Sequence, residues 1–405
     1  MMKRGRGFLL VIIFLLFGIF PSCKKPSAKW EAIIKKSDGI TVIKNPSFPR
    51  LPEMKITFEE ELTIGTAEGN ENDMFVSQVF INADEEGLIY ITDRERRTVK
   101  IYDPNGQYLF SIGRPGQGPG EFQDISRVIF DSEGHICLLD SSTQRISFFR
   151  KDGTFLNAKR TPLKIDMLRM NPQGFYIGRI PDSIKLKNAK SWDYVYGLFD
   201  PQFNLVKEFM RFPQEAWWTT KGKSLTQVLA NYLSSIAFRP RVHFDIDGKG
   251  FLYFGYPEEY VIRVYSPDGR LVKLIRREHE PRLIERKDKE RFMENQIGEL
   301  GSKIPDGEVR NIFSHISYPQ YKPAYERFAV MENGWIFVVV DSAESNSVLV
   351  DIFDQEGQYI AAFETNIPTE ELFFKNGKAY AVATIDGYKF IKRYRYTVSE
   401  IGDTL

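Results

Sequence analysis

Apolar and polar positions alternate along most of the chain in short runs, and the runs come in pairs joined by a turn that contains glycine. Alternation with period two is typical of strands that bury one face, and two such runs around a polar turn predict a hairpin. Six of these hairpins lie at Val79–Asp93, Val128–Asp140, Leu168–Arg179, Val242–Tyr256, Phe328–Asp341 and Glu371–Thr384. A second hairpin follows each of the first five.

The hairpins repeat at a fixed distance. Gly87 and Gly134 are 47 positions apart, and so are Gly106 and Gly153. Repeats of about 40–50 residues with about four strands each are the sequence signature of a β-propeller. We therefore predict an all-β fold, a six-bladed propeller over residues 54–398, followed by a C-terminal tail at 399–405.

The sixth blade lacks an outer strand in the C-terminal sequence. Residues 60–65 align with residues 108–113, which are the predicted outer strand of the first blade. We expect this N-terminal strand to pair with the last blade and close the ring, which would remove two open sheet edges.

Two segments interrupt the repeat, at about 213–240 between blades 3 and 4 and at about 278–322 between blades 4 and 5. In the first, apolar residues recur with helical spacing from Leu225 to Ile236, after a Ser224 and Gln227 capping box. In the second, an apolar stripe from Leu283 to Leu300 predicts another helix that stops at Gly301. Both inserts should rise on the face that carries the blade-to-blade connections.

The first 23 residues have the pattern of an export signal. Three basic residues precede the apolar run Phe8–Phe20, which is short for a membrane-spanning helix, and Cys23 follows it. The segment resembles the lipobox of bacterial lipoproteins, which implies lipidation at Cys23 and a place in the cell envelope, at the outer membrane or its periplasmic face. The alternatives are an ordinary secretory signal and an uncleaved anchor. Residues 24–53 are polar, and we predict a tether with at most one short strand, at Ile40–Ile43.

The segment Gly113–Phe122, GRPGQGPGEF, and the Asp-x-x-Gly hairpins resemble the six-bladed propellers of the NHL-repeat and TolB-like type. They are most similar to the propeller lipoproteins of Bacteroidetes and related bacteria. The resemblance spans roughly Met54–Thr397. It implies the fold but leaves the function open, because propellers host many unrelated activities.

The amino-acid composition limits the classes of molecule that the protein is expected to bind. The net charge is +1, so there is no overall electrostatic attraction to nucleic acid, and we expect none as a partner. The chain has two cysteines, Cys23 and Cys137; if Cys23 carries lipid, no internal disulfide can form. Cys137 lies in an apolar run and should be a buried small side chain. We expect a monomer that meets the membrane only through its lipid.

Three arginines occupy equivalent positions in different blades. Arg127, Arg241 and Arg327 each stand seven residues before a turn glycine, which would place their guanidinium groups at one height near the channel mouth. They could form a cationic ring for carboxylate, phosphate or sugar-acid groups, or simply ion pairs between blades and solvated loop tips. The full set of candidate ligand-binding residues adds a histidine, two rim residues and two tryptophans to them: Arg127, Arg241, Arg327, His243, Arg114, Glu121, Trp217 and Trp218.

No motif for catalysis or for a metal is visible. The chain has four histidines, and only His243 falls on a predicted inner strand, so we assign no metal site, no cofactor and no catalytic residue; calcium or zinc has no support in the pattern. We therefore predict a non-catalytic binding or scaffold platform for a protein, peptide or glycan. The alternative, which the resemblance implies, is a metal-assisted lyase or lactonase that acts at the channel mouth.

Overall fold

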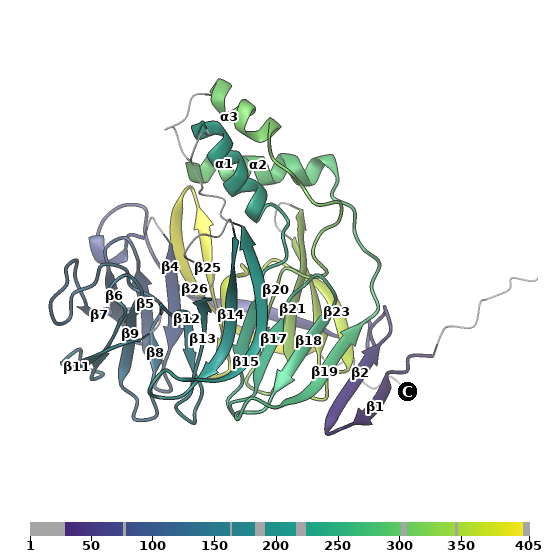
Figure 1. Cartoon of the computed structure of the whole chain (residues 1–405), viewed down its shortest axis with the longest axis horizontal. Helices are drawn as coiled ribbons and strands as arrows, with labels where there is room; N and C mark the ends of the chain where they lie inside the picture. The colour runs from purple at the N-terminus through teal and green to yellow at the C-terminus, as the bar shows by residue number, and fades with distance from the viewer. Residues whose placement is uncertain are drawn as a thin grey trace, which may run out of the picture.

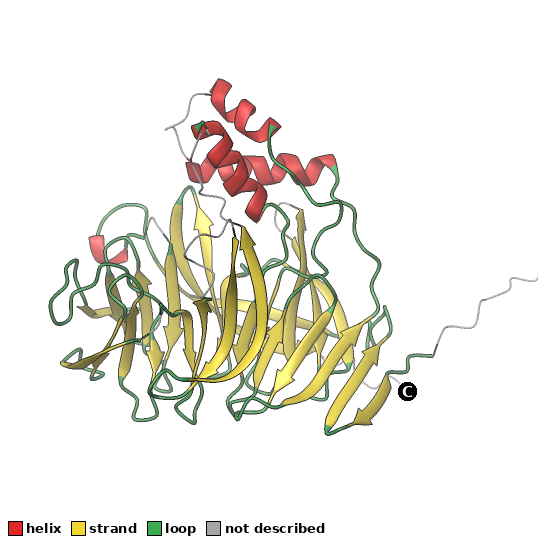
Figure 2. Ribbon diagram, viewed as in Figure 1, coloured by secondary structure: helices red, strands yellow, loops and turns green. Residues whose placement is uncertain are grey.

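The computed structural model describes residues 29–75, 78–162, 164–182, 191–215, 224–300, 306–344 and 347–399. The described chain forms six sheets, whose blade strands are antiparallel, arranged side by side as the blades of a propeller, and three α-helices that lie together over one face of it (Figures 1 and 2). None of the helices among the described residues is long and apolar enough to cross a membrane.

Each of the first five blades takes its four core strands from one continuous stretch of chain. Blade 1 consists of β4 (Val79–Ala83), β5 (Ile89–Asp93), β6 (Thr98–Tyr102) and β7 (Tyr108–Ile112). Blade 2 consists of β8 (Ile129–Phe130), β9 (Ile136–Asp140), β10 (Arg145–Phe149) and β11 (Phe155–Arg160). Blade 3 consists of β12 (Asp166–Met170), β13 (Tyr176–Pro181), β14 (Ser191–Phe199) and β15 (Leu205–Glu215). Blade 4 contains β16 (His243–Ile246), β17 (Leu252–Gly255), β18 (Val261–Tyr265) and β19 (Leu271–Arg277), and blade 5 contains β20 (Arg327–Val330), β21 (Ile336–Glu344), β22 (Ser347–Phe353) and β23 (Tyr359–Thr365).

Blade 6 combines the two ends of the domain. Its strands β24 (Glu370–Lys375), β25 (Lys378–Ile385) and β26 (Tyr388–Ser399) are joined by β3 (Lys55–Ile64). β3 pairs antiparallel with β26, from Ile64 opposite Ile391 to Lys55 opposite Ser399. The N-terminal strand is thus the outer strand of the last blade.

The short strand predicted at Ile40–Ile43 is present, but the rest of the chain before β3 differs from the tether that the sequence predicts. β1 (Ile33–Ser37) and β2 (Ile40–Asn45) form a hairpin, and β2 pairs in parallel with the outer strand of blade 4, so that this sheet has six strands. Asn45 fixes the hairpin: its Nδ2 donates to the backbone oxygens of Arg276 (3.0 Å) and Gly357 (2.9 Å), and its Oδ1 accepts from Tyr359 N (2.9 Å). β2 has the mixed sequence ITVIKN, with Lys44 exposed, and Ile43 is the residue that β2 contributes to the hydrophobic cluster between blades 4 and 5.

The repeated turns have a common hydrogen-bond pattern that explains why the sequence keeps an Asp or Asn at their first position. Asp103 Oδ1 accepts from Asn105 N (2.9 Å) and Gln107 N (2.8 Å), while Gly106 takes a positive φ of 81°. Equivalent carboxylate or amide oxygens accept the same two backbone N–H groups at Asp84, Asp131, Asn171, Asp200, Asp247 and Asp354. The side chain thus mimics a backbone turn, and glycine supplies the left-handed residue, except in the Asp200 turn, where Phe203 has a φ of 64°.

Six hydrophobic clusters lie between neighbouring blades, one at each junction around the ring. β3 contributes to two of them: Ile56 packs in the cluster of blades 5 and 6, and Ile64 in that of blades 6 and 1. Cys137 is fully buried in the cluster of blades 2 and 3, as predicted, and burial raises the pKa of its thiol.

The three helices form one helical cap. α1 (Leu225–Ile236) comes from the chain between blades 3 and 4, and α2 (Arg286–Leu300) and α3 (Asp306–Ser314) come from the chain between blades 4 and 5. The Ser224 and Gln227 capping box is present at the start of α1. Leu233 of α1 and Ile312 of α3 are buried in the cap's own core, with Phe292 of α2 packed against it.

The helical stripes are not buried along their whole length. Leu225 is 70% exposed and Leu283 is 57% exposed, whereas both were expected on the packed face. Leu283 precedes α2, so it is not on the helix, and Gly301 lies outside the described residues. β15 also continues to Glu215, two residues beyond the predicted start of the first insert.

Candidate functional site

A cleft of about 1270 Å³ lies between the helical cap and the adjoining ends of blades 4 and 5. Its floor contains Arg241, His243, Glu326 and Arg327, at the start of the inner strands β16 and β20. Its roof consists of the end of the first insert and the inner face of α2, with Phe238, Arg239, Lys287, Arg291, Phe292, Glu294 and Asn295. Asn366–Thr369, which connect blade 5 to blade 6, close one side.

The cleft is positively charged although the whole protein is nearly neutral. Seven arginine and lysine side chains line it, against four aspartates and glutamates. In a concave site with low-dielectric walls, an excess of one sign of charge concentrates the field at the opening. The cleft therefore favours an anionic ligand.

His243 shares the floor with two arginines, Arg241 and Arg327. Burial first, and then the charges of Arg327 and Arg241, lower the pKa of His243 to about 3. The imidazole is thus neutral at physiological pH, and its hydrogen bond with the Glu326 backbone holds it in place. Arg327 Nη1 donates to Thr369 O (2.9 Å), and Arg327 Nε has no hydrogen-bond partner within the described part of the chain.

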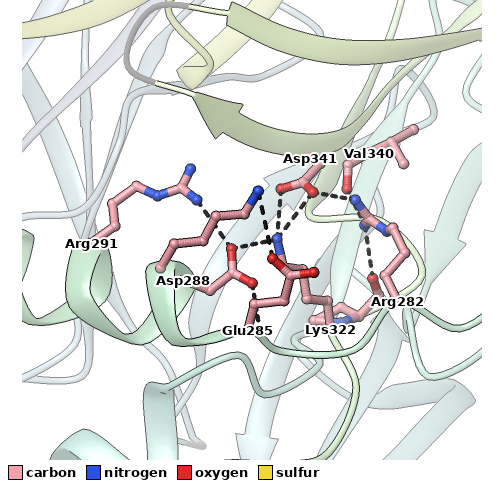
Figure 3. Close-up of polar contacts among 9 residues, drawn as sticks. Arg282, Glu285, Asp288, Arg291, Lys322, Val340 and Asp341 are labelled. Carbon is pink, nitrogen blue, oxygen red and sulfur yellow. Dashed lines mark hydrogen bonds and ion pairs between the residues drawn. The ribbon is translucent and has the colours of Figure 1, made fainter.

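An ionic network joins the cap to blade 5 beside this floor (Figure 3). Lys322 Nζ lies 2.7 Å from Asp288 Oδ1 on α2 and 3.1 Å from Asp341 Oδ2 on β21. Arg291 adds a second contact to Asp288, at 3.1 Å, and Arg282 pairs with Asp341 and donates to Val340 O at 2.7 Å. Neither Asp288 nor Lys322 was singled out by the sequence, since the network draws on three separate segments that share no motif.

These carboxylates are structural. Burial would raise the pKa of Asp288, but hydrogen bonds from Lys322 and from Glu285 N (2.9 Å) hold it below its usual range. Asp288 thus stays ionised and accepts from three donors, namely Lys322, Arg291 and Glu285 N. The network therefore fastens the cap above the cleft.

The three equivalent arginines do not form a ring. Arg241 and Arg327 reach the cleft. Arg127, just before the inner strand of blade 2, instead forms an ion pair with Glu371 on the inner strand of blade 6, and its guanidinium group lies 5.2 Å from the ring of Phe80 in blade 1, which stands between them. The equal distance to the turn glycine puts the backbone of the three arginines at equivalent positions, but the direction of each side chain depends on its partners in other blades. Of the two interpretations of the sequence, Arg127 follows the ion pair between blades.

Two charged residues on inner strands were not identified as site candidates from the sequence. Arg169 on β12 and Asp245 on β16 belong to inner strands, and Asp245 accepts from Val330 N at 2.8 Å. Burial, reinforced by the nearby Arg127, lowers the pKa of Arg169 to about 9. A signal was available, since both are charged residues inside otherwise apolar predicted strands.

The glycine-rich connection between blades 1 and 2 is held by its own glutamate. Glu121 Oε2 accepts from Gly118 N (2.9 Å) and Gln117 N (3.1 Å), and Glu121 Oε1 accepts from Arg114 Nε (2.9 Å). These bonds lower the pKa of Glu121. A Cβ added at Gly116 would lie 2.1 Å from Glu121 Oε2, so the glycine is needed for this contact. Glu121 shapes the loop, and Arg114 lies at the rim away from the cleft lining.

The remaining candidates lie outside the described residues, namely Trp217, Trp218 and Cys23. Within the described ranges, no three His, Cys, Asp or Glu side chains are grouped closely enough to hold a metal ion. A second cavity, of about 430 Å³, lies under Arg50–Met54 beside Trp335 and Val398. It is mostly apolar and borders outer strands, so it lacks the convergent polar groups of the cleft.

The comparisons with known proteins agree with the fold. Residues 73–250 match the model of a family described as a six-bladed β-propeller, DUF5128. A structure from Bacteroides fragilis, of a protein whose name describes it as exported, is similar with a TM-score of 0.52 and 11% identity, over 89% of this chain and 100% of that one. A DUF4221 family member from Bacteroides vulgatus follows at TM-score 0.47 and 10% identity (85% and 99% covered), and virginiamycin B lyase from Staphylococcus aureus at 0.42 and 12% (84% and 99% covered). No curated protein of known function matches the chain. The class is therefore a six-bladed β-propeller.

Proposed function

We propose that the protein is a binding platform of the bacterial cell envelope whose ligand lies in the cleft between the helical cap and blades 4 and 5. The observation that carries the proposal is the cleft itself, with a rigid propeller floor, a helical roof and an excess of positive charge. Sites built on rigid elements and roofed by an insert are typical places for ligand binding.

The chemistry of the cleft supports binding without catalysis. Asp288 and Asp341 are held as partners of Lys322. His243 has a pKa of about 3, far from the value near the working pH that an efficient general base needs. The ligand is a protein, peptide or glycan component with anionic groups.

An envelope location follows from the N-terminal pattern. Five residues separate Cys23 from residue 29, where the described chain starts, so they span at most about 20 Å even when fully extended. A lipid at Cys23 would hold the β1–β2 hairpin and the outer edge of blade 4 near the membrane. The Cys23→Ala variant is expected to move from the membrane fraction to the soluble periplasmic fraction. Retention in the membrane would instead indicate an uncleaved spanning anchor.

Hydrogen–deuterium exchange tests the position of the site independently of what the ligand is. The protein is mixed with a soluble extract of the host's cell envelope, and amide exchange is compared with and without the extract. Slower exchange is expected at residues 238–243, 286–295, 322–327 and 366–369, which line the cleft. The turns at 131–135 and 247–251 serve as internal controls, and protection confined to those turns or to outer strands would contradict the proposal.

A further inference from the structure

We infer that the ligand of the cleft is an acidic oligosaccharide, held by its sugar carboxylates on Arg241 and Arg327. This inference rests on the proposed function and specifies the chemistry of the ligand. Four features of the cleft support it.

The first feature is the kind of positive charge on the floor. Arg241 and Arg327 both line the floor close to His243, and arginine can pair with carboxylates through two parallel hydrogen bonds. Arg327 Nη1 donates to Thr369 O, which fixes this guanidinium group beside the cleft. A ligand carboxylate in the cleft would therefore meet two arginines of the floor.

The second feature is the neutral imidazole of His243, which lines the floor together with the two arginines. Because its pKa is lowered to about 3, His243 adds no positive charge to the floor at pH 7. A neutral imidazole suits an uncharged hydroxyl group, so the floor combines positive charge with neutral polarity. Sugar acids carry hydroxyl groups next to their carboxylates in the same way.

The third feature is the polar lining away from the floor. Ser347, Asn366 and Thr369 on the propeller side and Asn295 on α2 offer hydroxyl and amide groups. Phe238 and Phe292 add apolar rings. This mixture suits a hydroxyl-rich ring ligand, whose polar edges and apolar faces alternate.

The fourth feature is the shape. The lining contains no run of three consecutive strand residues, so an extended peptide has no strand edge in the cleft to pair with. At about 1270 Å³ the cleft also exceeds the roughly 300–1,000 Å³ that is usual for small-molecule pockets. The space fits a short oligomer better than a single sugar.

Isothermal titration calorimetry with four defined probes tests the inference. The probes are trigalacturonate, trimannuronate, the methyl-esterified form of trigalacturonate and triglutamate. At least one of the two uronate trimers is expected to bind, and the ester and the peptide should bind at least tenfold more weakly. Higher salt should weaken uronate binding, since part of the attraction is between charges.

Two matched variants locate the binding. Arg241→Gln is expected to weaken uronate binding about tenfold or more, because a charge-assisted hydrogen bond is lost. Arg270→Gln changes an arginine that is 80% exposed and pairs with Asp268 in a hairpin turn of blade 4, and it should leave binding unchanged. Thermal unfolding of both variants confirms that they are folded. If Arg241→Gln does not fold, Arg239→Gln in the roof replaces it, with a smaller expected loss.

The outcomes separate this inference from the proposed function. Equal binding of the ester and the acid would overturn the carboxylate contact. Binding of triglutamate as tight as that of the uronates would overturn the sugar and point to an acidic peptide. Failure of both uronates to bind would overturn the inference, while exchange protection of the cleft by the envelope extract would still support the platform with a different ligand.

Discussion

A chain that begins at residue 66 is expected to have no cooperative thermal unfolding transition, whereas a chain that begins at residue 54 keeps one. The two chains differ only by β3 and the residues beside it. Without β3, blade 6 loses the strand that pairs with β26 from Ile391 to Ser399. Circular dichroism at increasing temperature measures the difference.

The size of the effect follows from the position of β3 in the ring. Ile56 and Ile64 are each 3% exposed, and each packs in a different inter-blade cluster. Losing two fully buried side chains of this size costs roughly 3–6 kcal/mol, and the newly open edge of β26 exposes unpaired backbone groups. A typical domain has only about 5–15 kcal/mol of stability in total.

The chain that begins at residue 54 is the matched control. It lacks Ile43 and Asn45, so its midpoint should be lower than that of the intact chain, but its ring is complete. A synthetic peptide of residues 54–66, added to the shorter chain, should restore part of the transition. If the chain from residue 66 melts as sharply as the control, β3 is not essential to the ring.

The fold was largely predictable because it repeats. Each turn needs a side-chain oxygen acceptor at its first position and a left-handed residue near its end. The Asp-x-x-Gly pattern therefore recurs along the sequence. The start of α1 could also be predicted, because a capping box involves residues only three positions apart in the sequence. A strand at Ile40–Ile43 was predicted, but its place in the β1–β2 hairpin on the edge of blade 4 was not, because β2 pairs with a strand more than two hundred residues away.

The candidate site was predictable only in part. His243, Arg241 and Arg327 lie together because inner strands start at equal heights in adjacent blades. Arg127 has the same offset in sequence but pairs with Glu371, a partner that no offset reveals. That the two inserts form one cap also depends on a contact between distant segments, as in the packing of Leu233 beside Ile312.

The second large effect is expected at Lys322. Replacement by Met keeps most of the side-chain volume but removes the charge between Asp288 and Asp341, which are 2% and 14% exposed. Lys322→Met should therefore destabilise the attachment of the cap by about 2–4 kcal/mol. This is somewhat below the usual cost of leaving a buried charge without a partner, because Arg291 still pairs with Asp288 and Arg282 still pairs with Asp341. The exposed Lys249, in a hairpin turn of blade 4, provides the control variant Lys249→Met, which should have almost no effect.

The destabilisation should be confined to one place and should depend on charge. Hydrogen exchange is expected to speed up in α2 and α1 but not in blades 1 and 2, because the cap has its own core and meets blade 5 through this network. Adding Asp288→Asn and Asp341→Asn to Lys322→Met should recover much of the loss, since no unpaired buried carboxylate then remains. The wild-type contribution should be present at neutral pH and be lost as the pH falls below about 3.8, the ordinary pKa from which Asp288 is lowered. Equal exchange in α2 of the Lys322→Met and Lys249→Met variants would show that the apolar contacts of the cap alone keep it over the cleft.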